Sequence, residues 1–147
     1  MGRSVYPASM QLHPELLTAI DHGVHGHLVT INADGSAQVT VVWLGHHGDE
    51  VLVAHLGDGK KMHNIERDSR VVVSFTVDGA NAMGLHHYAV LHGRARLTDG
   101  GAPELLQDLA PRFLGEGVKF PPMDNPPPGR IVHITVERVG GVGPWVV

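Results

Sequence analysis

The chain has 147 residues, no cysteine and a formal net charge of −4. The length is typical of one domain with its own core. The acidic net charge argues against the broad basic surface of a nonspecific nucleic-acid binder. The absence of cysteine excludes disulfides and thiolate chemistry. The N-terminal segment MGRSVYPASMQLHPELL lacks the apolar core of a signal peptide, and no apolar run reaches the about 18 residues that a membrane span needs. We therefore expect one cytoplasmic domain over residues 1–147, without nucleic-acid or membrane partners.

Turn residues divide the first third of the chain. Pro14 at the first helical position and Gly23 after the last predict a helix over 14–22. The sequences NADGS and HHGDE then separate three β-rich runs, at 27–32, 37–45 and 50–56. Gly35 and Gly48 can supply the positive φ that tight hairpins require. Two hairpins are therefore expected here.

The second part of the chain alternates helices and long strands. GDGKKMHNIER predicts a short helix with Asp58 as its N-cap. Strands follow over 70–77 and 85–99, and Gly93 within the second of these predicts a bulge. APELLQDLAPRFLG predicts a helix that Pro111 kinks or ends, and RIVHITVERV predicts a last strand over 130–139.

Six β segments with helices between them favour a mainly β fold with short helices. Hairpin connections between the first strands argue against parallel βαβ winding. A small six-stranded antiparallel barrel, closed or nearly closed, leaves few sheet edges exposed. No glycine-rich Rossmann or Walker loop is present, so a nucleotide-like ligand would need another phosphate site.

Lys60 and Lys61 fall in the first turn of a predicted helix, where the helix dipole normally favours acidic residues. One interpretation is a phosphate clamp, in which both ammonium groups and the backbone N–H groups of the helix start converge on an anion. Gly57 and Gly59 would let a ligand approach the backbone. The alternative is an exposed, solvated basic turn.

The other candidate chemistries find little support. Adjacent strand residues face opposite sides, so the two histidines of a pair, His46–His47 or His86–His87, cannot both bind the same ion. The zinc-binding motif HExxH is also absent. We expect no metal site. No serine lies in G-x-S-x-G or S-x-x-K. If the protein is an enzyme, a cofactor carries the chemistry.

The segment EVLVAHLGDGKKMHNIERDSRVVVSF, followed by YAVLHGRARL, resembles the flavin-binding split-barrel family typified by pyridoxamine phosphate oxidase. The resemblance covers residues 26–137, and its specific part is Gly57, Lys60, Lys61 and Asn64 followed by RDSRVVVSF. LVTINADGSAQVTVVW and HGRARL make the chain more similar to the short actinobacterial branch that uses the deazaflavin coenzyme F420. QVTVVW and GGVGPWVV depart from the oxidases that use flavin mononucleotide (FMN).

The resemblance implies a six-stranded antiparallel split β-barrel of the FMN-binding type, assembled as a homodimer with cofactor sites at the interface. It implies an F420-dependent oxidoreductase that transfers a hydride to a conjugated substrate such as an enone or quinone. The alternatives are a non-catalytic F420-binding carrier and an FMN-binding oxidoreductase of the pyridoxamine phosphate oxidase type.

The same resemblance suggests residues for each role. Expected cofactor-binding residues are Val39, Thr40, Val41, Val42, His55, Leu56, Lys60, Lys61 and Asn64. Trp43 and Tyr88 are expected at the substrate, and His55, His87 and Tyr88 are candidates for a proton donor, a role that solvent could also fill. Trp145, two residues from the C-terminus, is expected to cover a core or to contact a partner or ligand.

Overall fold

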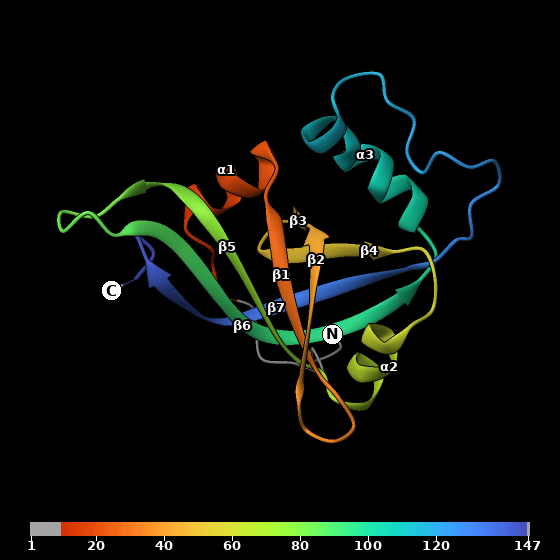
Figure 1. The fold of residues 1–147 in the computed structure, drawn as a ribbon, viewed down its shortest axis with the longest axis horizontal. Helices are drawn as coiled ribbons and strands as arrows, with labels where there is room; N and C mark the ends of the chain where they lie inside the picture. Colours follow the sequence, from red (N-terminus) through yellow and green to blue (C-terminus); the bar gives the residue numbers. More distant parts are fainter. Residues whose placement is uncertain (1–9, 147) are drawn as a thin grey trace, which may run out of the picture.

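The computed structural model describes residues 10–146 (Figure 1). The prediction about the N-terminal segment falls in large part on residues 1–9, outside the described residues. The elements are α1 (Pro14–His22), β1 (His25–Ile31), β2 (Ala37–Trp43), β3 (Gly45–His47), β4 (Glu50–His55), α2 (Lys60–Arg67), β5 (Arg70–Ala80), β6 (His86–Asp99), α3 (Ala102–Leu114) and β7 (Arg130–Val142). Within these residues, no helix is both long and apolar enough to cross a membrane.

All seven strands form one antiparallel sheet in the order β2-β1-β5-β6-β7-β4-β3. The sheet curls into a half-barrel, with α1 near one end and α2 near the other (Figure 1). Curling brings β2 into contact with β4, although the two strands are not hydrogen-bonded neighbours. The prediction of a mainly β antiparallel fold with short helices is confirmed.

The predicted number of six strands is wrong, because the run predicted as one strand over 37–45 breaks at Leu44. The Leu44 side chain is fully buried, and its backbone N–H donates to the carbonyl of Val24 at 3.4 Å. The chain therefore bends into the core at this point, and Gly45 begins a short strand that pairs with β4 instead of β1.

The interior of the half-barrel is apolar and continuous. Inward-facing residues of six strands and one face of each of α1 and α2 form a single cluster, which includes Leu16, Leu28, Val53, Met62, Phe75, Leu91 and Ile134. Burial of these side chains supplies the main stabilisation of the fold. Trp145 joins this cluster, so the predicted role in covering a core is confirmed.

The turn predictions depend on glycine and are confirmed. Gly35 and Gly48 have φ of 87° and 59° in the two hairpins. The β6–β7 register shifts between His92 and Gly93, so a bulge lies at the predicted place. A Cβ at Gly93 would overlap the carbonyl oxygen of Thr135, which explains why this position has no side chain.

Several element boundaries differ from the prediction. β1 begins two residues earlier, and β5 and β7 each continue three residues further, to Ala80 and Val142. Val142 pairs with Tyr88, so the extension is stabilised by a neighbouring strand rather than by local sequence. Helix α3 continues through Pro111 to Leu114, held by burial of Leu109 and Ala110 just before the proline.

Candidate functional site

Two unpaired strand edges face each other where the sheet is split. In the described chain, β2 pairs only with β1, and β4 pairs with β3 only as far as Leu52. Some backbone N–H and C=O groups are therefore free of sheet hydrogen bonds, both along β2 and in Val53–His55. We call this feature the β2–β4 split. It runs from His55 near α2 to Trp43 at the opposite end of β2.

Helix α2 starts at the His55 end of this split. Its N-cap is Gly59, in extended backbone, and no side chain caps the first turn, which also lacks acidic residues. The prediction of Asp58 as N-cap is therefore wrong. Asp58 Oδ1 instead accepts from the N–H of Gly59 at 3.1 Å, and its Oδ2 lies 3.4 Å from Nε2 of His63. The N–H groups of the first turn remain open to another acceptor.

The two lysines of this turn differ in environment. Lys60 is exposed. The pKa of Asp34 is lowered mainly by hydrogen bonds from the hydroxyl and the N–H of Ser36, and the charge of Lys60 adds a smaller effect. Lys61 has only 8% of its surface exposed, and no hydrogen bond or ion pair to it is found within residues 10–146. Burial lowers the pKa of Lys61. The alternative of two exposed, solvated lysines is therefore wrong for Lys61, whose charge lacks a counter-ion among the described residues.

His55 lies beside Lys61 at the end of β4. Burial lowers the pKa of His55, the nearby charge of Lys61 lowers it further, and Asp58 partly opposes both effects. A Cβ added to Gly59 would lie 3.7 Å from His55 Nε2, and a Cβ added to Gly57 would have no atom within 4 Å. A neutral imidazole, a buried ammonium and open backbone thus meet at one place.

Thr40 supplies an orphaned polar atom on β2. Among the described residues, its Oγ1 is the buried side-chain polar atom that lacks a hydrogen-bond partner. Native structures rarely leave such an atom unsatisfied without a ligand or water. The neighbouring Val39 and Val41 side chains point the other way, to the outer face, with 58% and 61% of their surface exposed. Val42 is buried in the core, and Leu56 follows β4 half-buried.

Asn64 serves an internal network. Its side chain is 2% exposed, and Nδ2 lies within hydrogen-bond distance of Thr30 Oγ1, Asn32 Oδ1 and Gln38 Oε1, at 3.1, 2.9 and 3.2 Å. Its Oδ1 accepts from Arg67 at 2.8 Å. The amide fastens α2 to the β1–β2 hairpin. Gln38 and Thr30 have this supporting role without having been singled out from the sequence.

Trp43 lies at the other end of the split, stacked against Phe113 of α3 with ring centroids 4.6 Å apart and an interplanar angle of 5°. Tyr88 is not near it within one subunit, because β1 and β5 lie between β2 and β6. His87 instead meets Trp145 edge-on at 5.7 Å, and Trp145 Nε1 donates to the carbonyl of Tyr88. The structure thus groups His55 with Lys61, and His87 and Tyr88 with the C-terminal tail.

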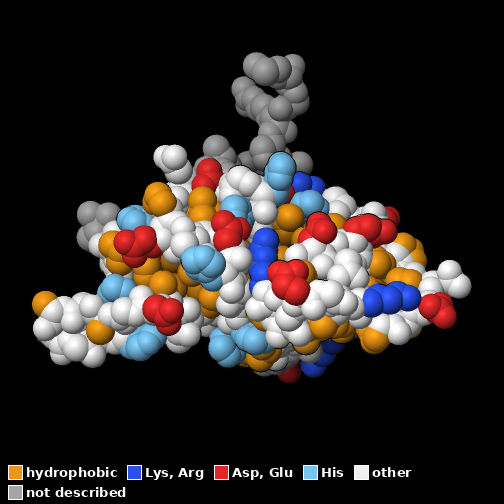
Figure 2. Space-filling model, turned by 90° about the horizontal axis from the view of Figure 1, so that it is seen from above, with side chains coloured by type: hydrophobic (Ala, Val, Ile, Leu, Met, Phe, Trp, Pro, Cys, Tyr) orange, Lys and Arg blue, Asp and Glu red, His pale blue; other side chains and the backbone are white. Residues whose placement is uncertain are grey.

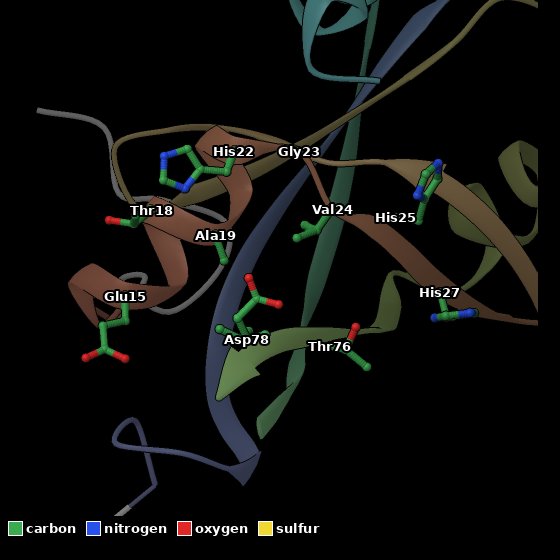
Figure 3. Close-up of a pocket in the computed structure, with 11 residues that line it drawn as sticks. Glu15, Thr18, Ala19, His22, Gly23, Val24, His25, His27, Thr76 and Asp78 are labelled. Carbon is green, nitrogen blue, oxygen red and sulfur yellow. The ribbon is translucent and has the colours of Figure 1, made fainter. Parts of the chain in front are cut away.

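A separate groove of about 660 Å³ lies between α1, β1 and β5 (Figure 3). Glu15 and His22 from α1, Asp78 from β5 and His25 and His27 from β1 line it. Despite these side chains, residues 10–146 contain no group of three His, Asp or Glu residues placed to hold a metal ion. Figure 2 shows one face of the molecule, on which histidines are scattered and Lys and Arg side chains are separated from one another.

Comparison with known proteins places this site in context. Residues 12–143 match the family model described as Pyridoxamine 5'-phosphate oxidase. A search of the curated proteins found no match. Among solved structures, an F420 reductase is 20% identical with a TM-score of 0.65, covering 84% of this chain and 94% of its own.

Two further solved structures show the same fold. Conserved hypothetical protein Rv2991 of Mycobacterium tuberculosis is 19% identical, with a TM-score of 0.66 and coverage of 92% of this chain and 88% of its own. HupZ of Group A Streptococcus is 18% identical, with a TM-score of 0.62 and coverage of 91% and 96%. At these identities the similarity establishes the fold.

Proposed function

From the premise that this chain belongs to the pyridoxamine 5'-phosphate oxidase family, which binds flavins such as FMN, we propose that it is an F420-dependent oxidoreductase. The observation that carries the proposal is Lys61, a buried ammonium without a counter-ion at the uncapped start of α2. A phosphate there would neutralise the charge and accept from the free N–H groups. The deazaflavin rather than FMN is favoured by the motifs of the short F420 branch and by the solved F420 reductase of the same fold.

The residues present fit such a cofactor. Lys61 and the first turn of α2 would hold the phosphate, with Lys60 adding charge from the surface. Thr40 Oγ1, which lacks a partner in the described structure, and the free backbone edges of the β2–β4 split would bind polar groups of the cofactor toward Trp43. His55, neutral at physiological pH because of its lowered pKa, can donate from one ring nitrogen and accept at the other.

When bound and reduced, the deazaflavin supplies a hydride for the electrophilic carbon of a conjugated substrate such as an enone or quinone, and one proton completes the two-electron reduction. The protein's own contribution is binding, orientation and exclusion of water along the split. His55 is the proton-donor candidate next to the proposed phosphate site. His87 and Tyr88 would reach it only from another subunit.

We also propose a homodimer. Val39 and Val41 form an exposed apolar strip on edge strand β2, directly outside the split. Apolar strips of this kind are typical of subunit interfaces. In a two-fold assembly the same strip would serve both subunits, so each cofactor site would lie beside the partner.

A titration of the purified protein with F420 and with FMN, followed by absorbance, tests the cofactor proposal. We expect saturable binding of F420, weaker binding of FMN, and reduced affinity at higher salt. Turnover of a quinone and an enone panel with reduced F420 distinguishes an enzyme from a carrier. Tight binding of FMN alone would support the flavin alternative.

A further inference from the structure

Three of the chain's seven Phe, Trp and Tyr residues gather outside the core. Trp43 stacks on Phe113 at 4.6 Å, and Phe120 lies tilted over Trp43 at 5.0 Å. All three are only partly buried, whereas Phe75 and Trp145 are buried in the core. A domain with so few aromatic residues gains most from them in its core. Their place at the end of the β2–β4 split therefore indicates a binding role.

Two of these rings belong to one excursion of the chain. Residues 102–128, which we call the arm, leave the sheet after β6 and return before β7, and α3 stands beside the sheet in Figure 1. The ends of the arm are joined, because Gly100 N–H donates to Gly129 at 2.7 Å and Ala102 N–H donates to Pro128 at 3.1 Å. The arm is thus rooted at one point.

The root and the tip of the arm meet opposite ends of the split. A Cβ at Gly129 would overlap the carbonyl oxygen of His55, so the root lies directly against the proposed phosphate end. The tip carries Phe113 onto Trp43 at the other end. Between them, Leu109 lies over Gly45, where an added Cβ would be 3.2 Å away. The arm therefore follows the length over which the proposed cofactor would extend.

We propose that Trp43, Phe113 and Phe120 form an aromatic subsite that binds the planar ring system of the substrate, and that the arm determines which rings are accepted. This inference rests on the proposed function. The stacked rings leave no space for a third ring between them, so a planar substrate enters only when Phe113 moves off Trp43, and Phe113 then covers the other face of the bound substrate. One stack is exchanged for another, and little ring contact is lost in the exchange.

His25 connects this subsite to solvent. Its ring contacts Phe113 at 4.9 Å, and the same side chain lines the groove of Figure 3. The groove therefore borders the subsite through His25, and its lining does not include His55 or Lys61 at the phosphate end of the split. A flat bicyclic quinone offers more stacking area than a single puckered enone ring, so we expect the subsite to favour the quinone.

The test uses 1,4-naphthoquinone and the fluorescence of the cofactor-free protein. The variant Trp145→Phe leaves Trp43 as the one tryptophan, and Trp43→Phe leaves the buried Trp145 as the reference. We expect saturable quenching of Trp43 and only collisional quenching of Trp145. Phe113→Leu should weaken the saturable phase at least fivefold, whereas Leu114→Ala, an exposed neighbour on the arm, should leave it unchanged.

Turnover provides the second measurement. With reduced F420, Phe113→Leu and Phe120→Leu should raise KM for 1,4-naphthoquinone more than KM for 2-cyclohexenone, with F420 affinity unchanged. Equal KM changes for both substrates, or nonsaturable quenching of Trp43, would overturn the subsite. If the protein does not bind F420 but the saturable, Phe113-dependent quenching persists, the proposed cofactor is overturned and the aromatic subsite stands.

Discussion

The buried ammonium of Lys61 lies close enough to His55 for its charge to lower the pKa of that imidazole. Two groups that can carry a positive charge thus share the end of β4, and neither has an ion pair shorter than 4 Å within the described residues. Such a pair is destabilising unless an anion joins it. The proposed phosphate would balance the charge of Lys61 at this place.

Substitution of Lys61 separates binding from stability. We expect Lys61→Met to weaken F420 binding by about 10- to 100-fold, the value of one charge-assisted contact. In the absence of ligand the same change should raise the melting temperature, because an unpaired charge leaves the interior. Lys60→Met is the matched control and should cost less affinity, since its exposed ammonium is screened by solvent. Unchanged affinity of the Lys61 variant in the absorbance titration would refute the phosphate clamp.

The pH dependence of binding follows from the lowered pKa of Lys61. Anion binding requires the protonated amine and raises its pKa in the complex. Affinity should therefore be constant near neutral pH and fall by up to about tenfold per pH unit as the pH rises through the pKa of the free protein, which lies below 10.5. Lys61→Arg stays charged and should abolish this decrease. An identical alkaline profile for wild type and Lys61→Arg would contradict the assignment.

A second pH effect concerns stability. Because the folded pKa of His55 is lowered from 6.5, the unfolded chain takes up the proton first. The contribution of His55 to stability is complete above pH 6.5 and is lost as the pH falls from there through the folded pKa. Urea denaturation of wild type and His55→Gln between pH 5 and 8 measures this difference. We expect the stability of wild type to fall more steeply with acid.

Asn64 is expected to act through stability. Asn64→Ala removes the donors for Thr30, Asn32 and Gln38 and the acceptor for Arg67. Loss of this buried amide should lower the free energy of unfolding by about 1–3 kcal/mol. Gln11→Ala, an exposed side chain before α1, should have no effect in the same urea titration. Full stability of the Asn64 variant would show that the network is dispensable.

The proposed homodimer depends on the outer face of β2. Val41→Glu would place a carboxylate within the apolar strip, where burial against a second subunit is costly. Light scattering should then give the mass of one chain, and F420 affinity should fall with it. Met83→Glu changes an equally apolar, 80% exposed residue on the β5–β6 hairpin and should leave the mass unchanged. A wild-type monomer that still binds F420 tightly would contradict the interface.

Local patterns in the sequence determined the mainly β class, α1, the glycine turns and the bulge at Gly93, because each depends on the conformational preferences of a few neighbouring residues. They also drew attention to Lys60 and Lys61, which stand out against the helix dipole. The break at Leu44, the length of β7 and the passage of α3 through Pro111 depend on burial and pairing with distant strands, which local preference does not encode.

The distinction between the two lysines was likewise decided only by the tertiary structure. The two are adjacent in sequence and share one helical turn, yet Lys60 faces solvent and Lys61 is buried near His55, because successive helix positions point about 100° apart. The stack of Phe113 on Trp43 joins residues 70 positions apart, and no periodicity in either segment predicts it. The sequence supplied the charged and aromatic groups, and the curled sheet with its arm determined which of them meet.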